Sequence, residues 1–221
     1  MTLRTHTWRD LALGSLVLAL LAGCQTAYFA TLEKLGYHKR DLLVSRVQEA
    51  RDTQEEAKTQ FESALAEFSS VVNFDGGKLE TTYKKLNAEL SQSEKSAKNI
   101  RDRIKAVEDV SEALFREWES ELEQYSSDNL RRASQRQLTE TRQRYTPLIG
   151  AMKRAESKID PVLVAFRDQV LFLKHNLNAQ AVASLQGELA SIETDISALI
   201  EEMEAAIAEA DAFIKAVGKA S

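Results

Sequence analysis

Apolar residues recur along most of this chain at spacings that alternate between three and four positions. The clearest series is Val182, Leu185, Leu189, Ile192, Ile196, Leu199, Met203, Ala206, Ala210, Phe213 and Val217. Its mean spacing of about 3.5 residues is typical of the buried seam of a left-handed coiled coil. A strand would need alternation with a period of two. The pattern therefore predicts a long helix that buries one narrow face.

Three further series of the same kind run over residues 43–71, 79–118 and 138–177. Most of their members are Leu, Val, Ile, Ala, Phe or Tyr. The polar members are Gln54, Ser93, Ser111 and Thr141. Each series predicts another helix with one apolar face toward a shared core.

Turn-forming residues separate these series. Two glycines and two Asx residues stand at 73–77, capping residues stand at 126–129, and Asn176 and Asn178 mark a third break. We expect helices at 40–73, 78–125, 129–176 and 179–217, nearly equal in length and each about 60–70 Å long. Short connections make neighbours antiparallel, so the predicted fold is all-α, an elongated antiparallel coiled-coil or four-helix bundle with long helices. Looser pairing into two hairpins stays open.

Proline interrupts the third series. The apolar steps from Ala155 to Ile159 and to Leu163 are four plus four, and Pro161 lies between the last two. A proline removes a helical hydrogen bond and kinks or breaks a helix. Asp160 before it could also cap a new helix. The sequence leaves open whether the helix is kinked or restarts at Pro161.

The first residues have a different character. A basic start is followed by an apolar run at 11–22, which is too short to span a bilayer and suits a secretory signal peptide. The run ends in Leu21-Ala22-Gly23-Cys24, which resembles the lipobox of bacterial lipoproteins. This resemblance implies cleavage before Cys24 and acylation of that cysteine; the alternative is an ordinary signal peptide that contains a cysteine.

The expected divisions are therefore a cleaved lipoprotein signal peptide (1–23), a membrane-proximal segment (24–39) and a helical coiled-coil bundle (40–221). Several acyl chains would hold the protein stably on a membrane. Position two of the mature chain is Gln25 and not Asp. By resemblance to lipoprotein sorting, this favours the outer membrane, with the chain on its periplasmic face.

The membrane-proximal segment combines apolar and basic residues. Tyr28, Phe29, Leu32 and Leu35 share one helical face, and the basic residues of the segment are Lys34, Lys39 and, just after it, Arg40. Such a segment either lies on the membrane surface with its aromatic side chains toward the bilayer, or extends the first helix and packs on the bundle.

Composition gives little support to catalysis. The formal net charge is −5 with both signs mixed, which does not suggest a nucleic-acid partner. His38 and His175 have no Glu three residues earlier, and no His/Cys cluster is present. No nucleophile elbow, phosphate loop or dinucleotide motif appears. We expect no catalytic residue, metal, cofactor or small-molecule substrate.

Two stretches of the third helix are candidate binding surfaces. Arg131, Arg132 and Arg136 could bind an anionic lipid or glycan. Arginines and lysines at 142–154 would instead pair with acidic residues at 201–211 across a hairpin. The apolar residues of 161–173 cover more than one seam, so Val164, Leu171 and Phe172 belong either to a central helix or to an interface with a partner or a second copy.

Several motifs resemble an uncharacterised family of helical lipoproteins from Gram-negative bacteria, known only as a domain of unknown function. They are the lipobox, Lys34-Leu35-Gly36-Tyr37-His38-Lys39-Arg40-Asp41, Asn73-Phe74-Asp75-Gly76-Gly77, Leu114-Phe115-Arg116-Glu117-Trp118, and the stretch from Asp160-Pro161 to Asn178. The resemblance implies a helical fold and a membrane address, and no activity.

From this we expect a lipid-anchored periplasmic structural or interaction protein, a coiled-coil scaffold for envelope partners or for self-assembly. The alternative is a non-enzymatic binding module for anionic lipid or envelope glycan.

Overall fold

Four long helices make up the described part of the protein. The computed structural model describes residues 39–73 and 79–218. The helices are α2 (Lys39–Val72), α3 (Leu79–Leu122), α4 (Asp128–His175) and α5 (Ala179–Val217). The four predicted helices are confirmed, and their ends fall within a few residues of the expected positions.

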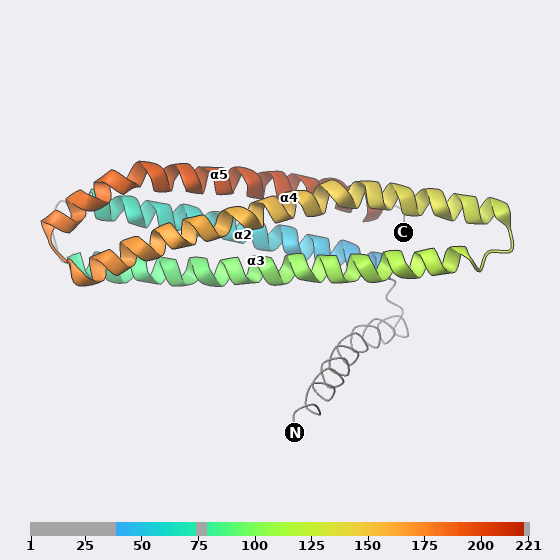
Figure 1. Ribbon diagram of the computed structural model, residues 1–221, viewed down its shortest axis with the longest axis horizontal. Coiled ribbons are helices and arrows are strands. Elements are labelled where there is room, and N and C mark those ends of the chain that lie inside the picture. The colour runs from blue at the N-terminus through green and yellow to red at the C-terminus, as the bar shows by residue number, and fades with distance from the viewer. Residues whose placement is uncertain (1–38, 74–78, 219–221) are drawn as a thin grey trace, which may run out of the picture.

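The helices form one antiparallel bundle and not two loosely paired hairpins. Each packs on two neighbours: α2 on α3 and α5, and α4 on α3 and α5. Helices that follow each other along the chain run in opposite directions, as Figure 1 shows. The predicted fold class is confirmed, and contacts between α2 and α5 close the ring.

The apolar seams form the core. Every member of the 43–71 series is buried in α2. In α5 the series is buried throughout, except that Leu189 is only partly covered. Phe68 and Phe166 meet edge to face with ring centroids 6.2 Å apart, joining α2 to α4 across the interior. Burial of these side chains, at roughly 25 cal/mol per Å² of apolar area, is the main stabilising contribution.

Two polar side chains in the core have no partner. Gln54 is 1% exposed, and neither its Oε1 nor its Nε2 is hydrogen-bonded. The Ser93 hydroxyl is also buried and has no hydrogen-bond partner. Ser111 differs, because its hydroxyl donates to the backbone oxygen of Glu108 over 2.9 Å. A buried polar group without a partner costs about 1–3 kcal/mol, so Gln54 weakens the seam that it occupies.

Helix α4 runs without a break through both Pro147 and Pro161. The open question at Pro161 is thus decided in favour of one continuous helix. Pro161 itself is exposed, while Ile159 and Val162 on either side are buried. Burial of the seam on both sides outweighs the single hydrogen bond that the proline removes.

The expectation of nearly equal helix lengths is wrong. Helix α2 has 34 residues and α4 has 48. At the start of α2, the Lys39 ammonium lies 2.7 Å from the Glu117 carboxylate, and Arg40 donates to the backbone oxygen of Val217 over 2.9 Å. Of the described helices, only α3 and α4 continue past this level (Figure 1). We call this projecting hairpin, residues 118–141, the overhang.

We predict that Gln54→Leu raises the free energy of unfolding by about 1–2 kcal/mol, because it replaces an unpartnered buried amide with an apolar side chain of similar size. Chemical denaturation of the two proteins measures the difference. Gln48→Leu, at an exposed position of the same helix, is the control and should change stability little. A destabilised Gln54→Leu variant would mean that the amide has a partner, such as a buried water.

Candidate functional site

Contacts between α3 and α4 brace the overhang. Trp118 donates from Nε1 to the Ser134 hydroxyl over 2.7 Å, and Leu138 of α4 is fully buried. Arg142 donates to Glu119 over 2.6 Å, and its guanidinium lies 5.0 Å from the centre of the Phe115 ring. These contacts fix the direction in which the hairpin projects from the bundle.

The connection between the two helices is also ordered by local chemistry. The Ser127 side chain accepts from the backbone N–H of Leu130 and caps α4. Asp128 in the first turn suits the positive end of the helix dipole. Ser127, one of the predicted capping residues, therefore caps this helix. The helix begins at Asp128, one residue before the expected start at 129.

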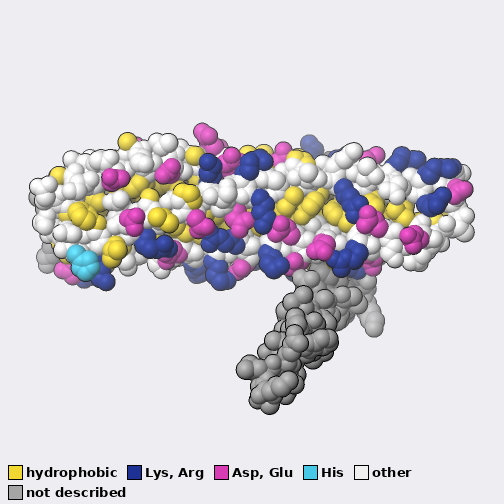
Figure 2. Space-filling model, viewed as in Figure 1, with side chains coloured by type: hydrophobic (Ala, Val, Ile, Leu, Met, Phe, Trp, Pro, Cys, Tyr) yellow, Lys and Arg dark blue, Asp and Glu magenta, His cyan; other side chains and the backbone are white. Residues whose placement is uncertain are grey.

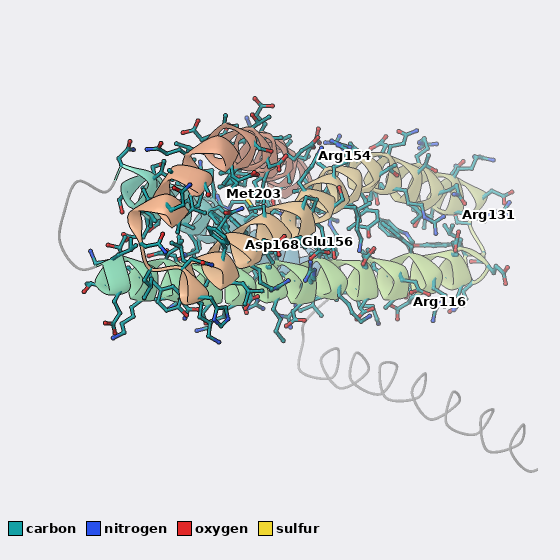
Figure 3. All side chains as sticks on the ribbon, turned by 60° about the vertical axis from the view of Figure 1, so that its left-hand side comes forward. Arg116, Arg131, Arg154, Glu156, Asp168 and Met203 are labelled. Atoms are coloured by element: carbon teal, nitrogen blue, oxygen red, sulfur yellow. The ribbon has the colours of Figure 1, made fainter. Side chains whose placement is uncertain are left out.

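The three candidate anion-binding arginines all lie at the outer end of the overhang, where Figure 2 shows basic side chains gathered along the start of α4. Arg131, labelled in Figure 3, contacts Asp128 over 2.9 Å, and Arg132 donates to the Asn129 side chain over 2.6 Å. Arg136 is exposed, and no described residue is bonded to its guanidinium. Two of the three cations are thus partly engaged within their own helix turn.

A shallow groove of about 430 Å³ runs between the helices here. On one side it is lined by Glu119 and Leu122 of α3 and by Glu123 just after that helix, and α4 contributes Arg131, Arg132 and Gln135. Because acidic and basic groups face each other, the groove is not uniformly positive. The geometry favours pairing within the hairpin over a dedicated anion site.

The predicted charge pairing between α4 and α5 is only partly confirmed. Arg154 donates to Glu202 over 3.1 Å, as expected from the hairpin register. Lys153 contacts Glu108 of α3 over 3.0 Å and Glu156 of its own helix over 3.3 Å, so it does not pair with α5. Burial favours the neutral amine, but hydrogen bonds to Glu108 and Glu156 raise the pKa of Lys153.

Other acidic residues of α5 pair with α2. Glu204 accepts from Lys58 over 3.5 Å, and Asp211 accepts from Arg51 over 3.1 Å. This follows from the position of α5 between α4 and α2, which gives its charged flanks two neighbours. The sequence pattern alone could not show this second neighbour.

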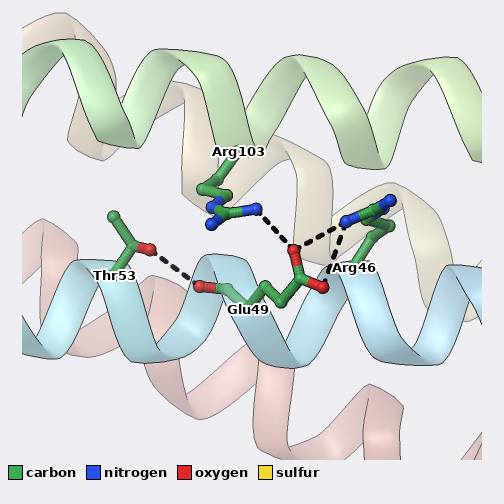
Figure 4. Close-up of polar contacts among 4 residues, drawn as sticks. All are labelled: Arg46, Glu49, Thr53 and Arg103. Carbon is green, nitrogen blue, oxygen red and sulfur yellow. Dashed lines mark hydrogen bonds and ion pairs between the residues drawn. The ribbon is translucent and has the colours of Figure 1, made fainter.

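A polar cluster that the sequence did not indicate joins α2 to α3 (Figure 4). The Glu49 carboxylate lies 2.8 Å from Arg46 and 2.5 Å from Arg103, and the Thr53 hydroxyl donates to the Glu49 backbone oxygen over 2.9 Å. Partly exposed ion pairs of this kind contribute modestly to stability. Their more definite effect is to fix the register of the two helices.

The three apolar residues suggested as an interface face outward. Val164 is 51% exposed, Leu171 is 55% exposed and Phe172 is 39% exposed. The buried seam of α4 runs along its other side, through Phe166 and Val170. Apolar side chains show among charged ones along this part of the molecule in Figure 2. The central-helix interpretation is therefore wrong for these three residues, which we call the α4 stripe.

Other candidate residues fall at or beyond the edge of the described chain. Cys24, Tyr28, Phe29 and Lys34 lie outside the described residues. Lys39 and Arg40 are described, and both bind within the bundle, to α3 and to the end of α5. In α2 to α5, no helix is long and apolar enough to cross a membrane. Residues 39–73 and 79–218 contain no cluster of three His, Cys, Asp or Glu side chains placed to hold a metal ion.

The fold and these surfaces define an all-α protein of the antiparallel four-helix-bundle class. Comparison of the sequence with known families matches residues 28–217 to a family described as a protein of unknown function, DUF2959, and the chain belongs to that family. No curated protein and no solved structure matches the chain.

We predict that Glu119→Gln reduces the stability of the protein above the ordinary carboxyl range and has little effect in strong acid. The hydrogen bond from Arg142 lowers the pKa of Glu119. The stabilisation is therefore complete above the ordinary carboxyl pKa and is lost as the pH falls through the lowered value. Thermal unfolding of both proteins across the acid range measures it.

Glu121→Gln is the matched control, because no described residue forms an ion pair with Glu121. Identical pH profiles for Glu119→Gln and the unchanged protein would contradict the role given to the Arg142–Glu119 pair.

Proposed function

We propose that this chain is a lipid-anchored structural or interaction protein of the bacterial envelope. In this proposal the lipid on Cys24 tethers it to the outer membrane on the periplasmic side. The bundle then presents its long surfaces to an envelope protein or to a second copy of the chain. The proposal describes a scaffold and gives the described residues no catalytic role.

The tether is supported by the order of the N-terminal residues. A basic start, a short apolar run and small residues directly before Cys24 follow the pattern of a lipoprotein signal. With more than one acyl chain, attachment would be stable without any membrane-spanning helix.

The α4 stripe is the observation that carries the interaction part of the proposal. Exposed single apolar residues are ordinary, but Val164, Leu171 and Phe172 recur at helical spacing on one side of one helix. While this side of α4 is in contact with water, its apolar side chains contribute no burial energy. Covered by a partner, it would contribute burial energy on the same scale as the seams. Helical surfaces with such a stripe commonly pack against another helix.

We predict that Cys24→Ala abolishes labelling of the protein by radioactive palmitate, because the substitution removes the sulfur that would carry the lipid. Fractionation of cells that express the two forms, with labelling by radioactive palmitate, makes the measurement. Gln25→Asp should keep the label and shift the protein toward the inner membrane, which separates loss of the lipid from a change of sorting. Equal palmitate labelling of Cys24→Ala and the unchanged protein would remove the lipid anchor from the proposal.

We predict that a photo-crosslinker at Leu171 captures one defined protein species in cells. The same crosslinker at Leu173, which lies two residues further along α4 and is fully buried, should give no intermolecular product. Phe172→Glu should abolish capture at Leu171 because it places a charge in the contact, and it should leave thermal unfolding unchanged because the side chain is already partly exposed. Capture that is equally strong with Phe172→Glu would argue against the α4 stripe as a specific interface.

A further inference from the structure

The exposed face of α4 changes character from one end of the helix to the other. Its first part, in the overhang, carries Arg131, Arg132 and Arg136, and its last part carries Asp168 among the apolar side chains of the α4 stripe. Figure 3 shows Arg131 at the outer end of α4 and Asp168 on the same helix toward the opposite end. Such a face complements itself when two copies lie antiparallel, because the basic end of each then meets the other end of its neighbour.

Two charges on this face have no partner among the described residues. Arg136 is exposed and its guanidinium is bonded to none of them, and Asp168 is exposed and forms no ion pair with any of them. The neighbouring Arg167 is neutralised by Glu94 of α3, 2.6 Å away. Arg136 and Asp168 lie 32 residues apart. A helix covers this separation in about nine turns, so the two side chains leave α4 on nearly the same side.

The same two residues are placed symmetrically along α4. The helix runs from Asp128 to His175, and its midpoint and the midpoint between Arg136 and Asp168 both fall within one residue of Met152. If two α4 helices pair about a two-fold axis at this level, residue 136 of each copy lies beside residue 168 of the other. Opposite charges then meet twice, and the ends of the two helices coincide.

The middle of α4 allows a second helix to approach closely. Gly150 lies two residues from this midpoint and is only partly covered. A Cβ atom placed on it would meet only the Arg154 guanidinium, 3.7 Å away, so packing within the bundle does not require a glycine. A glycine inside a helix is less favourable than an alanine. Close approach of another backbone gives this glycine a physical reason.

The cations nearest the midpoint are neutralised within each copy. Lys153 contacts Glu108 over 3.0 Å and Glu156 over 3.3 Å. Arg154 donates to Glu202 over 3.1 Å. Two copies therefore bring no uncompensated like charges together at this level, where repulsion would oppose pairing.

The α4 stripe supplies apolar contact to the same arrangement. In this register Leu171 lies beside Ala133 of the second copy, and Phe172 lies beside Arg132. The stem of an arginine covers apolar surface while its guanidinium stays in water, and the guanidinium stacks on aromatic rings. Two-fold symmetry repeats each of these contacts, so both stripes are covered together.

The face is large enough for a stable dimer. Helix α4 has 48 residues, which make it about 70 Å long, and with a width of about 10 Å it presents roughly 700 Å² on each copy. Stable interfaces bury about 800 Å² on each partner. Apolar burial at the stripe would supply affinity, and the charge pairs would select the antiparallel direction.

We propose that two copies of this chain pair antiparallel along α4, with Arg136 of each copy bound to Asp168 of the other. The proposal rests on the interaction role proposed above and names a second copy as the partner of the α4 stripe. It also gives the overhang a purpose. The overhang carries the start of α4 beyond α2 and α5, so that its arginines reach the stripe of the second copy.

Charge reversal in the full chain, purified in a mild non-ionic detergent, tests the pairing by sedimentation equilibrium. Arg136→Asp and Asp168→Arg should each raise the dissociation constant of the dimer by about tenfold or more, because like charges then meet twice in the interface. The double variant should restore the dimer, since the same pair forms with its signs exchanged. Arg116→Asp, at an exposed position of α3, is the control and should leave association unchanged.

Disulfide formation separates antiparallel from parallel pairing. Gln143 and Pro161 are both exposed and lie beside each other across the two copies in the proposed register. A mixture of Gln143→Cys and Pro161→Cys chains should form a mixed disulfide. Gln143→Cys alone should not link to itself, because the two positions lie about 27 Å apart along the helices. Mass spectrometry of the linked peptides distinguishes these bonds from any bond at Cys24.

A chain that stays monomeric, single variants that associate as tightly as the unchanged chain, or Gln143→Cys chains that link to themselves would overturn the proposal. A monomer whose Leu171 crosslinker captures a different protein overturns the self-pairing and leaves the interaction role in place, whereas a monomer with no capture contradicts both. Loss of the dimer in both single variants and its return in the double variant support the proposal, whatever palmitate labelling shows.

Discussion

Burial of one narrow apolar seam from each of four helices is the constraint on which the rest of this structure depends. The seam residues repeat every 3.5 positions, so each helix can keep one face inward over its whole length. The energy of this burial is large enough to keep α4 helical through Pro161 and to retain Gln54 in the core without a partner. It also decides which side chains must face water.

Charged residues on the flanks of the seams then select one packing among several. Ion pairs join α2 to α3 through Glu49, α2 to α5 through Lys58 and Arg51, and α4 to α5 through Arg154. Each is partly exposed and contributes little free energy alone. Together they fix which helices are neighbours and in what register, so they supply specificity where the seams supply stability.

The unequal helix lengths divide the described part of the molecule into a four-helix region and the overhang. Where all four helices are present, Val164, Leu171 and Phe172 of the α4 stripe are large apolar side chains exposed to solvent. Where only α3 and α4 of the described helices continue, the exposed surface is mainly polar and carries Arg131, Arg132 and Arg136 near its tip. The exposed α4 stripe is the described surface on which the proposed interaction role rests. The family to which the chain belongs is described by no activity, so this division is the firmest guide to its role.

The four helices, their turns and most of the buried positions could be predicted from the sequence, because hydrophobic spacing and turn chemistry are local properties of the chain. Gln54 and Ser93 were identifiable as polar seam members from spacing alone. The tertiary structure decided the closed ring, the second neighbour of α5, the Glu49 cluster and the outward direction of Leu171. These depend on which helix lies beside which, and residues more than a hundred positions apart, such as Arg51 and Asp211, meet only after the seams have packed.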